Sequence, residues 1–390
     1  MKQHLSGHIL TPAGFVRGRL DIDDDRIVRL DGAPVDEAVV RADRDTPLLL
    51  PGFIDLHVHG GGGADTMDAG DAAQTLARLH ARHGTTALLA TTMTAPLGDI
   101  EAALHALAPA VRERSRGASR LLGVHLEGPY ISPDKLGAQP PFARAPGLAE
   151  LLALNAIAPI RLVTLAPEVS GMLALIPALV EAGMRVQIGH SGASYEQAVE
   201  AMQQGATGYT HLFNAMSPLH HRAPGAVGAA LAHAQHAEII PDLLHVHPGA
   251  IRAALRAIPG LFCVSDATAA AGMPDGDYRL GRQTVTKCLG GVRLADGTLA
   301  GSTLTMDQAL RNLVAIGLSL QEAAARVSSH AADYLRLPDR GRLAVGAVAD
   351  IVGLDAATLQ LQQVWVEGEA LAGASAPDHP RHLGKVTRTA

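Results

Sequence analysis

Short apolar runs and amphipathic stretches alternate along the middle of the chain, and this alternation predicts an α/β fold. Stretches such as residues 71–84 and 100–114 carry apolar residues at helical spacing. The apolar runs between most of these stretches are short enough to be buried strands. We expect eight strands, at residues 50–60, 85–92, 121–128, 160–168, 185–190, 207–213, 237–242 and 261–267.

The strand–helix alternation indicates parallel strands that are joined by crossover helices. Eight such units predict a closed (β/α)8 TIM-like barrel over residues 51–339. A doubly wound open sheet is the competing architecture. We disfavour it because the segment after the first strand, HGGGGADTMD (residues 59–68), lacks a GxGxxG motif that runs into a helix.

The two ends of the chain have a different pattern from the middle. Residues 1–50 and 340–375 contain short strand-like runs that are separated by Gly and Asp turn signals. We therefore expect one small β-sandwich domain built from both termini. Residues 376–390 contain Pro, His and Arg without periodicity, and we expect a loose C-terminal tail there.

The composition is that of a folded protein without the usual features of nucleic-acid binding. Of the 390 residues, 47% are hydrophobic and 18% are charged, which excludes a disordered chain. The net charge of −6 argues against nucleic acid or an anionic membrane as the main partner. The aromatic residues, 1 Trp, 5 Tyr and 5 Phe, are too few for base-stacking platforms. We see neither a signal-peptide pattern nor an apolar stretch of about 20 residues, so we expect a cytoplasmic protein.

Histidine and cysteine usage narrows the possible chemistry. The chain has 19 His, which directs attention to metal binding and proton transfer. Its two cysteines, Cys263 and Cys288, form no CxxC motif and exclude a disulfide framework or a zinc ribbon. Any metal must therefore be held by imidazole and carboxylate groups.

Polar residues stand where the predicted barrel strands end, and barrel enzymes carry their chemistry at these C-terminal strand ends. The first strand ends with two histidines at positions i and i+2, which point to the same face. Together with the other strand ends, this gives a set that suits a Zn²⁺ or Fe²⁺-type centre. The residues are His57, His59, Glu127, His190, His211 and Asp266.

Each of these residues alone also has a structural interpretation. A single histidine at a strand end is more often a hydrogen-bonded core or loop residue, and Glu127 could cap a helix. Ser265 or Asp266 could be a helix N-cap. The metal-centre hypothesis therefore depends on the combination, because six separate structural roles would have to coincide at one end of a barrel.

For the polar residues outside this set, the sequence either leaves the role open or favours a structural role. His80 and His83 stand at i, i+3 in a helical stretch and predict a solvated face. His245, just past the seventh strand, is either a substrate contact or a plain loop residue. Arg222, after the sixth strand, is either a surface cation or an anion clamp.

Several longer motifs along the chain are more specific. They are PGFIDLHVHGGGGADTMD (51–68), HLEGPYIS (125–132), IGHSGASYEQA (188–198), THLFNAMSPLHHRAPG (210–225), SDATAAAGMPDG (265–276), LAGSTLTMDQALRNLV (299–314) and GRLAVGAVADIVGLD (341–355). These segments resemble the amidohydrolase superfamily and, within it, the N-acetylglucosamine-6-phosphate deacetylase family. HLEGP, TH-x-FNAM and LAGS-x-LTM are specific to the deacetylases, whereas HxH and ADIV are shared across the superfamily.

The resemblance implies a metal-dependent amide hydrolase that removes acetate from the 2-amino group of an amino-sugar 6-phosphate. Glu127, His190 and His211 match metal ligands found throughout the family. His57 and His59 match those of members that hold a second ion. We expect one or two divalent ions per subunit, with Zn²⁺ as the first choice and Fe²⁺, Mn²⁺ or Co²⁺ as alternatives.

The resemblance also implies a substrate site and an assembly state. Asp266 matches the catalytic acid/base, and we count it among the metal ligands as well. In this family the phosphate site is completed across a dimer interface, so we expect a homodimer. The positions that match substrate contacts are Asn214, Ala215, Arg222 and His245 at the sugar phosphate, and Leu299, Ala300 and Gly301 near the acetyl group.

The chemistry of amide hydrolysis agrees with this assignment. A metal ion that lowers the pKa of bound water to about 7 supplies hydroxide and polarises the carbonyl. Asp266 would accept the proton of the water and then transfer it to the departing amine. The guanidinium of Arg222 could bind the phosphate through two parallel N–H donors.

The chain departs from the family pattern in two places that concern the substrate. After EGPYIS the family usually carries a substrate-contacting histidine, whereas this chain has Ala138 and Gln139 there. Around His245, the usual Asp-Gly reads Asp242-Leu243-Leu244, and His247 stands where Asp is common. The resemblance still makes N-acetylglucosamine 6-phosphate the leading substrate, and the two departures leave alternatives open. N-acetylgalactosamine 6-phosphate, another N-acyl amino sugar and a non-catalytic metal-barrel scaffold are the alternatives.

Overall fold

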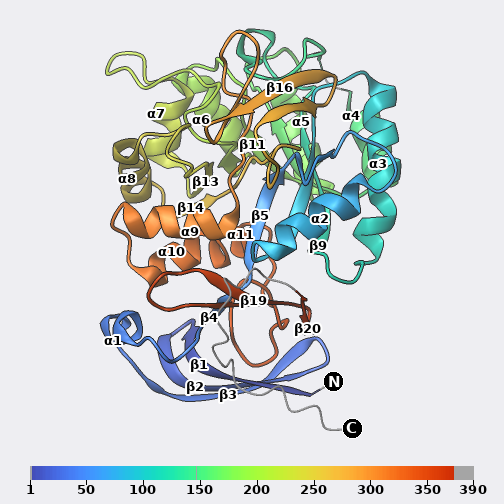
Figure 1. Cartoon of the computed structure of the whole chain (residues 1–390). Coiled ribbons are helices and arrows are strands. Elements are labelled where there is room, and N and C mark those ends of the chain that lie inside the picture. The colour runs from blue at the N-terminus through green and yellow to red at the C-terminus, as the bar shows by residue number, and fades with distance from the viewer. Residues whose placement is uncertain (1, 146, 373–390) are drawn as a thin grey trace.

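The computed structural model describes residues 2–145 and 147–372, and its central feature is a barrel of parallel strands (Figure 1). Six strands form one sheet in the order β12-β11-β10-β9-β8-β5, and β13 pairs with β14. The predicted fold class, a barrel with a small sheet domain from both termini, is confirmed. One barrel strand overlaps each predicted segment: β5 (Phe53–Val58), β8 (Thr85–Thr92), β9 (Arg120–Glu127), β10 (Ile160–Leu165), β11 (Arg185–Ile188), β12 (Gly208–Tyr209), β13 (His236–Ile239) and β14 (Gly260–Cys263).

Backbone hydrogen bonds close the barrel where its two sheets meet. The amide of Leu212, after β12, donates to the carbonyl of Glu238 on β13 at 2.9 Å. On the other side, the amide of Asp266, after β14, donates to the carbonyl of His57 on β5, also at 2.9 Å. Because the strands are parallel and the barrel is closed, all their C-terminal ends meet at one mouth.

Helices cover the outside of the barrel (Figure 1). Their buried apolar residues belong to the same core as those of the barrel strands. The helix α6 begins with a capping box, in which Ser194 and Gln197 satisfy each other's backbone amides. The helices around the barrel are α2 (Ala72–Arg82), α3 (Leu97–Arg112), α4 (Leu148–Ile157), α5 (Met172–Glu181), α6 (Tyr195–Gln203), α7 (Gly225–His233), α8 (Pro248–Ala257), α9 (Met306–Ala315), α10 (Leu320–Arg326) and α11 (Ser329–Tyr334).

The barrel interior is polar below the mouth, and its polar groups are hydrogen-bonded from strand to strand. The register pairs Thr91 on β8 with His125 on β9. His125 Nε2 lies 2.7 Å from the hydroxyl of Thr164 on β10. That hydroxyl lies 2.7 Å from the one of Thr210, which in turn donates to Gln187 on β11 at 2.8 Å. Buried polar groups that are paired in this way do not carry the free-energy cost of unsatisfied ones, and they tie neighbouring strands together.

Strands from both ends of the chain form one continuous seven-stranded sheet, in the order β20-β19-β18-β4-β1-β2-β3. β4 joins the two halves, because it pairs with β1 on one side and with β18 on the other. Ile9, Leu20 and Trp365 belong to a separate apolar core within this part of the protein. The elements are β1 (Gln3–Thr11), β2 (Gly14–Asp23), β3 (Arg26–Pro34), α1 (Glu37–Ala42), β4 (Leu48–Pro51), β18 (Ile351–Leu354), β19 (Leu361–Val366) and β20 (Glu369–Ala370).

The limits that we predict for the domains, residues 1–50 with 340–375 and residues 51–339, stay a prediction. The predicted tail at 376–390 lies outside the described residues. Across the part of the chain that the structure describes, no helix combines the length and the apolar character that a membrane span requires.

A three-stranded antiparallel sheet that the sequence does not predict lies at the mouth of the barrel (Figure 1). Arg282, in the turn between its first two strands, forms an ion pair with Asp99 at 2.6 Å. The neighbouring amide of Gly281 donates to Asp65 Oδ2 at 3.0 Å. The strands are β15 (Gly276–Leu280), β16 (Gln283–Cys288) and β17 (Gly291–Arg293), and the short elements nearby are β6 (Gly60–Gly61), β7 (Ala64–Asp65) and the 3₁₀ turn η1 (Pro133–Lys135).

Candidate metal centre and active site

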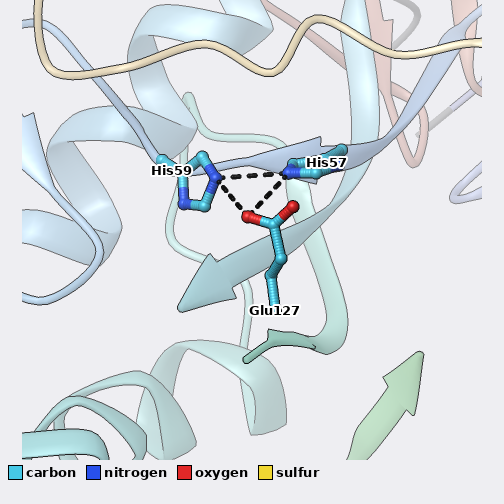
Figure 2. A group of neighbouring side chains, drawn as sticks. All are labelled: His57, His59 and Glu127. Atoms are coloured by element: carbon cyan, nitrogen blue, oxygen red, sulfur yellow. Dashed lines mark hydrogen bonds and ion pairs between the residues drawn. The ribbon is translucent and has the colours of Figure 1, made fainter. Parts of the chain in front are cut away.

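Two imidazoles and one carboxylate meet at the ends of β5 and β9 (Figure 2). His57 and His59 lie at the end of β5, and their Nε2 atoms are 3.2 Å apart. Glu127, the last residue of β9, places its Oε2 3.0 Å from His59 Nε2 and 3.5 Å from His57 Nε2. All three side chains are buried.

The other oxygen of Glu127 faces a second pair of imidazoles. Its Oε1 lies 3.2 Å from Nε2 of His190, after β11, and 3.0 Å from Nε2 of His211, after β12. The two Nε2 atoms are 3.1 Å apart. The single carboxylate of Glu127 therefore bridges two imidazole pairs, with one oxygen at each.

Asp266 lies beside the first imidazole pair, at the exit of β14. Its Oδ1 is 3.4 Å from Nε2 of both His57 and His59. The residue is 8% exposed, whereas His57 is 0% exposed, so a molecule in the pocket can reach the carboxylate of Asp266. The structure thus brings together all six residues that the sequence singles out at the strand ends.

The charges of the cluster support one another. Burial opposes the charge of Glu127, but the imidazoles of His57 and His190 outweigh it and hold the pKa of this carboxyl well below its usual range. Burial also disfavours a charge on His57, yet the carboxylates of Glu127 and Asp266 raise the pKa of that imidazole well above its usual value. The surroundings therefore favour an ionised Glu127 beside positive charge, which is the arrangement that a bound cation also requires.

Three residues of the cluster have a left-handed backbone conformation. The φ angles are 45° at His190, 30° at His211 and 51° at Asp266. Such conformations cost residues with a side chain on the order of 1–3 kcal/mol and tend to occur at functional sites. Neighbouring backbone hydrogen bonds hold them: the amide of Ser132 donates to the His190 carbonyl at 3.0 Å, and that of Ser302 donates to the Asp266 carbonyl at 2.7 Å.

Hydrogen bonds at the far nitrogens orient two of the imidazoles. His190 Nδ1 lies 2.8 Å from the carbonyl oxygen of Lys135, and His59 Nδ1 lies 3.3 Å from that of Thr91. A carbonyl oxygen only accepts, so each Nδ1 donates a proton to it. In the neutral imidazole this leaves Nε2 as the atom that can bind a metal.

Glu238, on β13, contacts the imidazole of His57 and the backbone of His211, and the sequence analysis missed it. Its Oε2 lies 3.0 Å from His57 Nδ1 and accepts the backbone amide of His211 at 3.2 Å. The side chain is fully buried. The signal that could have identified it is a single carboxylate inside the apolar strand segment AEIIPD (237–242).

The donor atoms fit a divalent transition-metal ion. The groups His57–His59–Glu127 and Glu127–His190–His211 each hold three ligand atoms that lie within 4.8 Å of one another. Imidazole and carboxylate are the usual protein ligands of Zn²⁺ and related ions. Three protein ligands leave the fourth position of a tetrahedral site for water or substrate, as in catalytic zinc sites.

The cluster lines a pocket of about 270 Å³. The polar residues at its wall, beyond the cluster itself, include Lys135, Asn214 and His245. The hydrogen bond between His245 Nδ1 and Asp242 Oδ2 is 2.6 Å long. Burial would lower the pKa of His245, but the bond and the charge of Asp242 raise it above its usual value. Asp242 thus favours the protonated form of His245, and that form suits an anionic ligand.

Most of the predicted substrate contacts line this pocket, and two do not. Ala300 is fully buried in an apolar cluster beside it. Arg222 is exposed, lies outside the pocket of its own chain, and contacts His221 Nε2 at 2.7 Å. The predicted residues at the pocket wall are Ala138, Gln139, Asn214, Ala215, His245, Leu299 and Gly301.

Gln139 directly contacts the cluster of six predicted ligands, called the metal-type cluster below (His57, His59, Glu127, His190, His211 and Asp266). Its Nε2 donates to Glu127 Oε2 at 2.6 Å, while its Oε1 accepts the amide of Thr94 at 2.7 Å. The side chain is therefore fixed between β8 and β9 and is 6% exposed.

The prediction that His80 lies on a solvated face is wrong. His80 is fully buried, and its Nε2 lies 2.9 Å from the carbonyl of Gly60. Burial lowers its pKa to about 4, so the imidazole is neutral. The helix α2 packs directly on the glycine run after β5: a Cβ on Gly61 would approach Cδ2 of Leu79 to 2.6 Å, so a larger residue there would require the Leu79 side chain to move.

Comparisons with known proteins agree with this geometry. Residues 48–371 match a family model described as "Amidohydrolase family". The chain is 42% identical over 370 residues to an N-acetylgalactosamine-6-phosphate deacetylase of Escherichia coli O157:H7, which covers 93% of this chain and 97% of that one. It is also 42% identical over 315 residues to an N-acetylglucosamine-6-phosphate deacetylase of Lysinibacillus sphaericus, with 79% and 81% covered.

A solved structure resembles almost the whole chain. It is that of a mutant N-acetyl-D-glucosamine-6-phosphate deacetylase from Mycobacterium smegmatis in complex with N-acetyl-D-glucosamine-6-phosphate. The TM-score is 0.87 at 37% sequence identity, and the match covers 95% of this chain and 99% of the other.

Proposed function

The chain belongs to the amidohydrolase family, and from this membership we propose that it is a metal-dependent deacetylase of N-acetyl-D-glucosamine 6-phosphate. The products are D-glucosamine 6-phosphate and acetate. The observation that carries the proposal is the carboxylate of Glu127, which contacts two imidazole pairs in a pocket that also contains Asp266. The relatives that are named for this reaction support the same substrate class.

The six clustered residues are the proposed metal ligands. A bound divalent ion, for which zinc is our first choice, would polarise the amide carbonyl and lower the pKa of a water molecule. The two oxygens of Glu127 support occupancy by one or two ions. We assign Glu127, His190 and His211 to one ion, and His57, His59, Asp266 and the second oxygen of Glu127 to the other.

Asp266 is the proposed proton carrier. Its carboxylate accepts a proton from the attacking water as the new C–O bond forms at the acyl carbon. It then gives that proton to the amide nitrogen as the C–N bond breaks, so that the amine leaves uncharged. Its exposure to the pocket and its distance of 3.4 Å from both His57 and His59 support this role.

The polar wall of the pocket suits the sugar phosphate. Asn214 and Ala215 follow β12, and His245 follows β13, so the three lie side by side at the mouth. Lys135 lines the same pocket. Phosphate oxygens are strong acceptors for such cationic and amide donors.

A homodimer is part of the proposal, with Arg222 reaching the phosphate in the pocket of a second copy. Arg222 is exposed and lies away from its own pocket, and the nearby Leu219 is 55% exposed. An apolar side chain next to a cation on the loop after β12 supports contact with another chain. A cytoplasmic location is proposed as well.

The galactosamine epimer of the substrate is the second candidate. The carboxamide of Gln139 replaces a family histidine at the pocket wall. A relative with 42% identity over 97% of its length is named for that epimer. The same ions and the same Asp266 would serve both substrates, so only the fit of the sugar distinguishes them.

Acetate release by the metal-replete protein tests the proposal. We expect at least about one turnover per second with N-acetylglucosamine 6-phosphate. The value of kcat/KM should be lower for N-acetylgalactosamine 6-phosphate and for unphosphorylated N-acetylglucosamine. Preference for the galactosamine epimer would change the substrate and keep the chemistry. No release from any of the three, with metal present by elemental analysis, would contradict the proposal.

Glu238→Ala is expected to weaken metal binding at His57 and His59 more than at His190 and His211. Glu238 contacts His57 Nδ1 at 3.0 Å and orients the ring. Losing such an outer contact typically reduces metal affinity by about 10–100-fold. Titration of metal-free protein with zinc against a competing chelator, resolved into two binding steps, measures the effect.

Two further variants control this experiment. Glu238→Gln keeps an acceptor oxygen near His57, so we expect a smaller loss than with alanine. Gln187 is another buried polar residue of the barrel interior, and its side chain accepts a hydrogen bond from Thr210. Gln187→Met should therefore leave both zinc-binding steps unchanged. If Glu238→Ala weakens both steps equally, or neither, Glu238 does not orient His57 for metal binding.

A further inference from the structure

A second cavity lies behind one wall of the active-site pocket. It has a volume of about 590 Å³ and is lined by Met67 and Thr94, and it opens to solvent beside the exposed Arg279. Met93 lines both this cavity and the pocket that holds the metal-type cluster. Because Met93 is only 2% exposed, its side chain is packed between the two spaces and forms part of the wall that separates them.

Met93 is held firmly at this position. It is the first residue after β8, and its amide donates to the sulfur of Met67 at 3.3 Å. Its side chain belongs to an apolar cluster with Leu280 and Ala300, against which Ala138 packs. The pocket is therefore apolar where it meets Met93, since Ala138 and Leu280 line it as well.

The strand order places this apolar wall across the mouth from the polar one. β8 is the second and β12 the sixth of the eight barrel strands along the chain, and consecutive strands are neighbours in the sheet. In a closed barrel of eight strands, the second and the sixth lie opposite each other. Met93, which follows β8, therefore lies opposite Asn214 and Ala215, which follow β12. The metal-type cluster lies between these two walls.

These two walls suit the two ends of an N-acyl amino-sugar phosphate. When its amide lies at the cluster, the sugar phosphate extends toward the polar wall, and the acyl group toward the apolar one. From this arrangement we propose that Met93 sets the largest N-acyl group that the enzyme accepts. The inference rests on the proposed deacetylase function and adds to it the residue that limits the acyl chain. An acetyl group ends in front of Met93, whereas a butyryl group needs the space that its side chain occupies.

Met93→Ala tests this inference because it joins the pocket to the cavity behind. We expect kcat/KM for N-butyrylglucosamine 6-phosphate to rise relative to N-acetylglucosamine 6-phosphate by at least about tenfold, the usual discrimination by an apolar pocket. Hydrolysis of the longer amide is followed by butyrate release. Arg279→Ala is the control: it removes an exposed side chain from the lining of the same cavity and leaves Met93 and its contacts with Met67 in place, so the substrate ratio should not change.

The outcomes separate the inference from the function on which it rests. If the wild-type protein does not release acetate, the proposed function fails. If wild type and Met93→Ala both release acetate with the same butyryl-to-acetyl ratio, the inference is wrong. An equal rise in Arg279→Ala also overturns it, because the cavity and not the Met93 wall would then set the limit. Met93→Val leaves a smaller void should the alanine variant not fold, and it should admit the propionyl substrate in the same way.

Discussion

Asp266→Asn is expected to lower kcat for deacetylation by about 10²–10⁴-fold, which is the usual contribution of a general acid–base group. The amide has the size of the carboxylate and keeps an oxygen near His57 and His59, but it cannot accept the proton of the attacking water. KM should stay close to the wild-type value, because Asn214 and His245 still line the pocket. Steady-state acetate release, together with elemental analysis of each preparation, measures both quantities.

Asp307→Asn is a suitable control for this variant. Asp307 is another buried carboxylate, it does not line the active-site pocket, and it forms an ion pair with Arg311 at 2.9 Å. Its replacement should leave kcat within the range of ordinary conservative changes. Wild-type kcat in Asp266→Asn, with the metal retained, would exclude Asp266 as the proton carrier. Loss of the metal would instead make it primarily a ligand.

Glu127→Gln is expected to abolish both metal binding and activity. The two oxygens of Glu127 lie 3.0 Å from His59 and from His211, so one substitution removes the anionic ligand of both imidazole pairs. A ligand that binds only the folded state stabilises it by about 2.7 kcal/mol at a concentration of 100 Kd. Zinc should therefore raise the Tm of the wild-type protein and leave that of Glu127→Gln nearly unchanged.

Thermal unfolding with and without zinc, metal content and acetate release together measure this effect. Glu150→Gln provides the control, because Glu150 is a carboxylate outside the cluster that accepts the hydroxyl of Tyr130 at 2.6 Å. It should show the same zinc-dependent rise in Tm as the wild type. Full metal content in Glu127→Gln would contradict the assignment of this carboxylate as the shared ligand.

The barrel and its cluster could be predicted from the sequence because both depend on local patterns. Apolar runs between helical stretches locate the strands, and parallel closure brings the strand ends to one mouth. Residues as distant as His57 and Asp266 therefore had to approach each other once the fold class was known. To predict that these residues meet, it is enough to know the order of the strands, and the packing of the side chains is not required.

Features that depend on tertiary partners could not be predicted in this way. The sequence marks Glu238 as a carboxylate within an apolar strand, but which group it supports is seen only from its contact with His57. His80 looks solvated beside the arginines of its helix, but packing on Gly61 buries it. The sheet of β15 to β17 consists of short strands with turn residues between them, and its anchoring contacts, such as that of Arg282 with Asp99, are distant in sequence. Arg222 lies outside the pocket, because its place after the sixth strand does not determine the direction of its side chain.

The central position of β4 in the terminal sheet affects how the chain can fold during synthesis. β1, β2 and β3 leave the ribosome first and can pair at once, and β4 can join β1 soon after. The other edge of β4 then waits for β18, which is translated only after the entire barrel. Until then the nascent chain carries an open strand edge of unpaired N–H and C=O groups, the kind of edge that templates aggregation. Pairing of β18 with β4 is thus the step that covers this open edge.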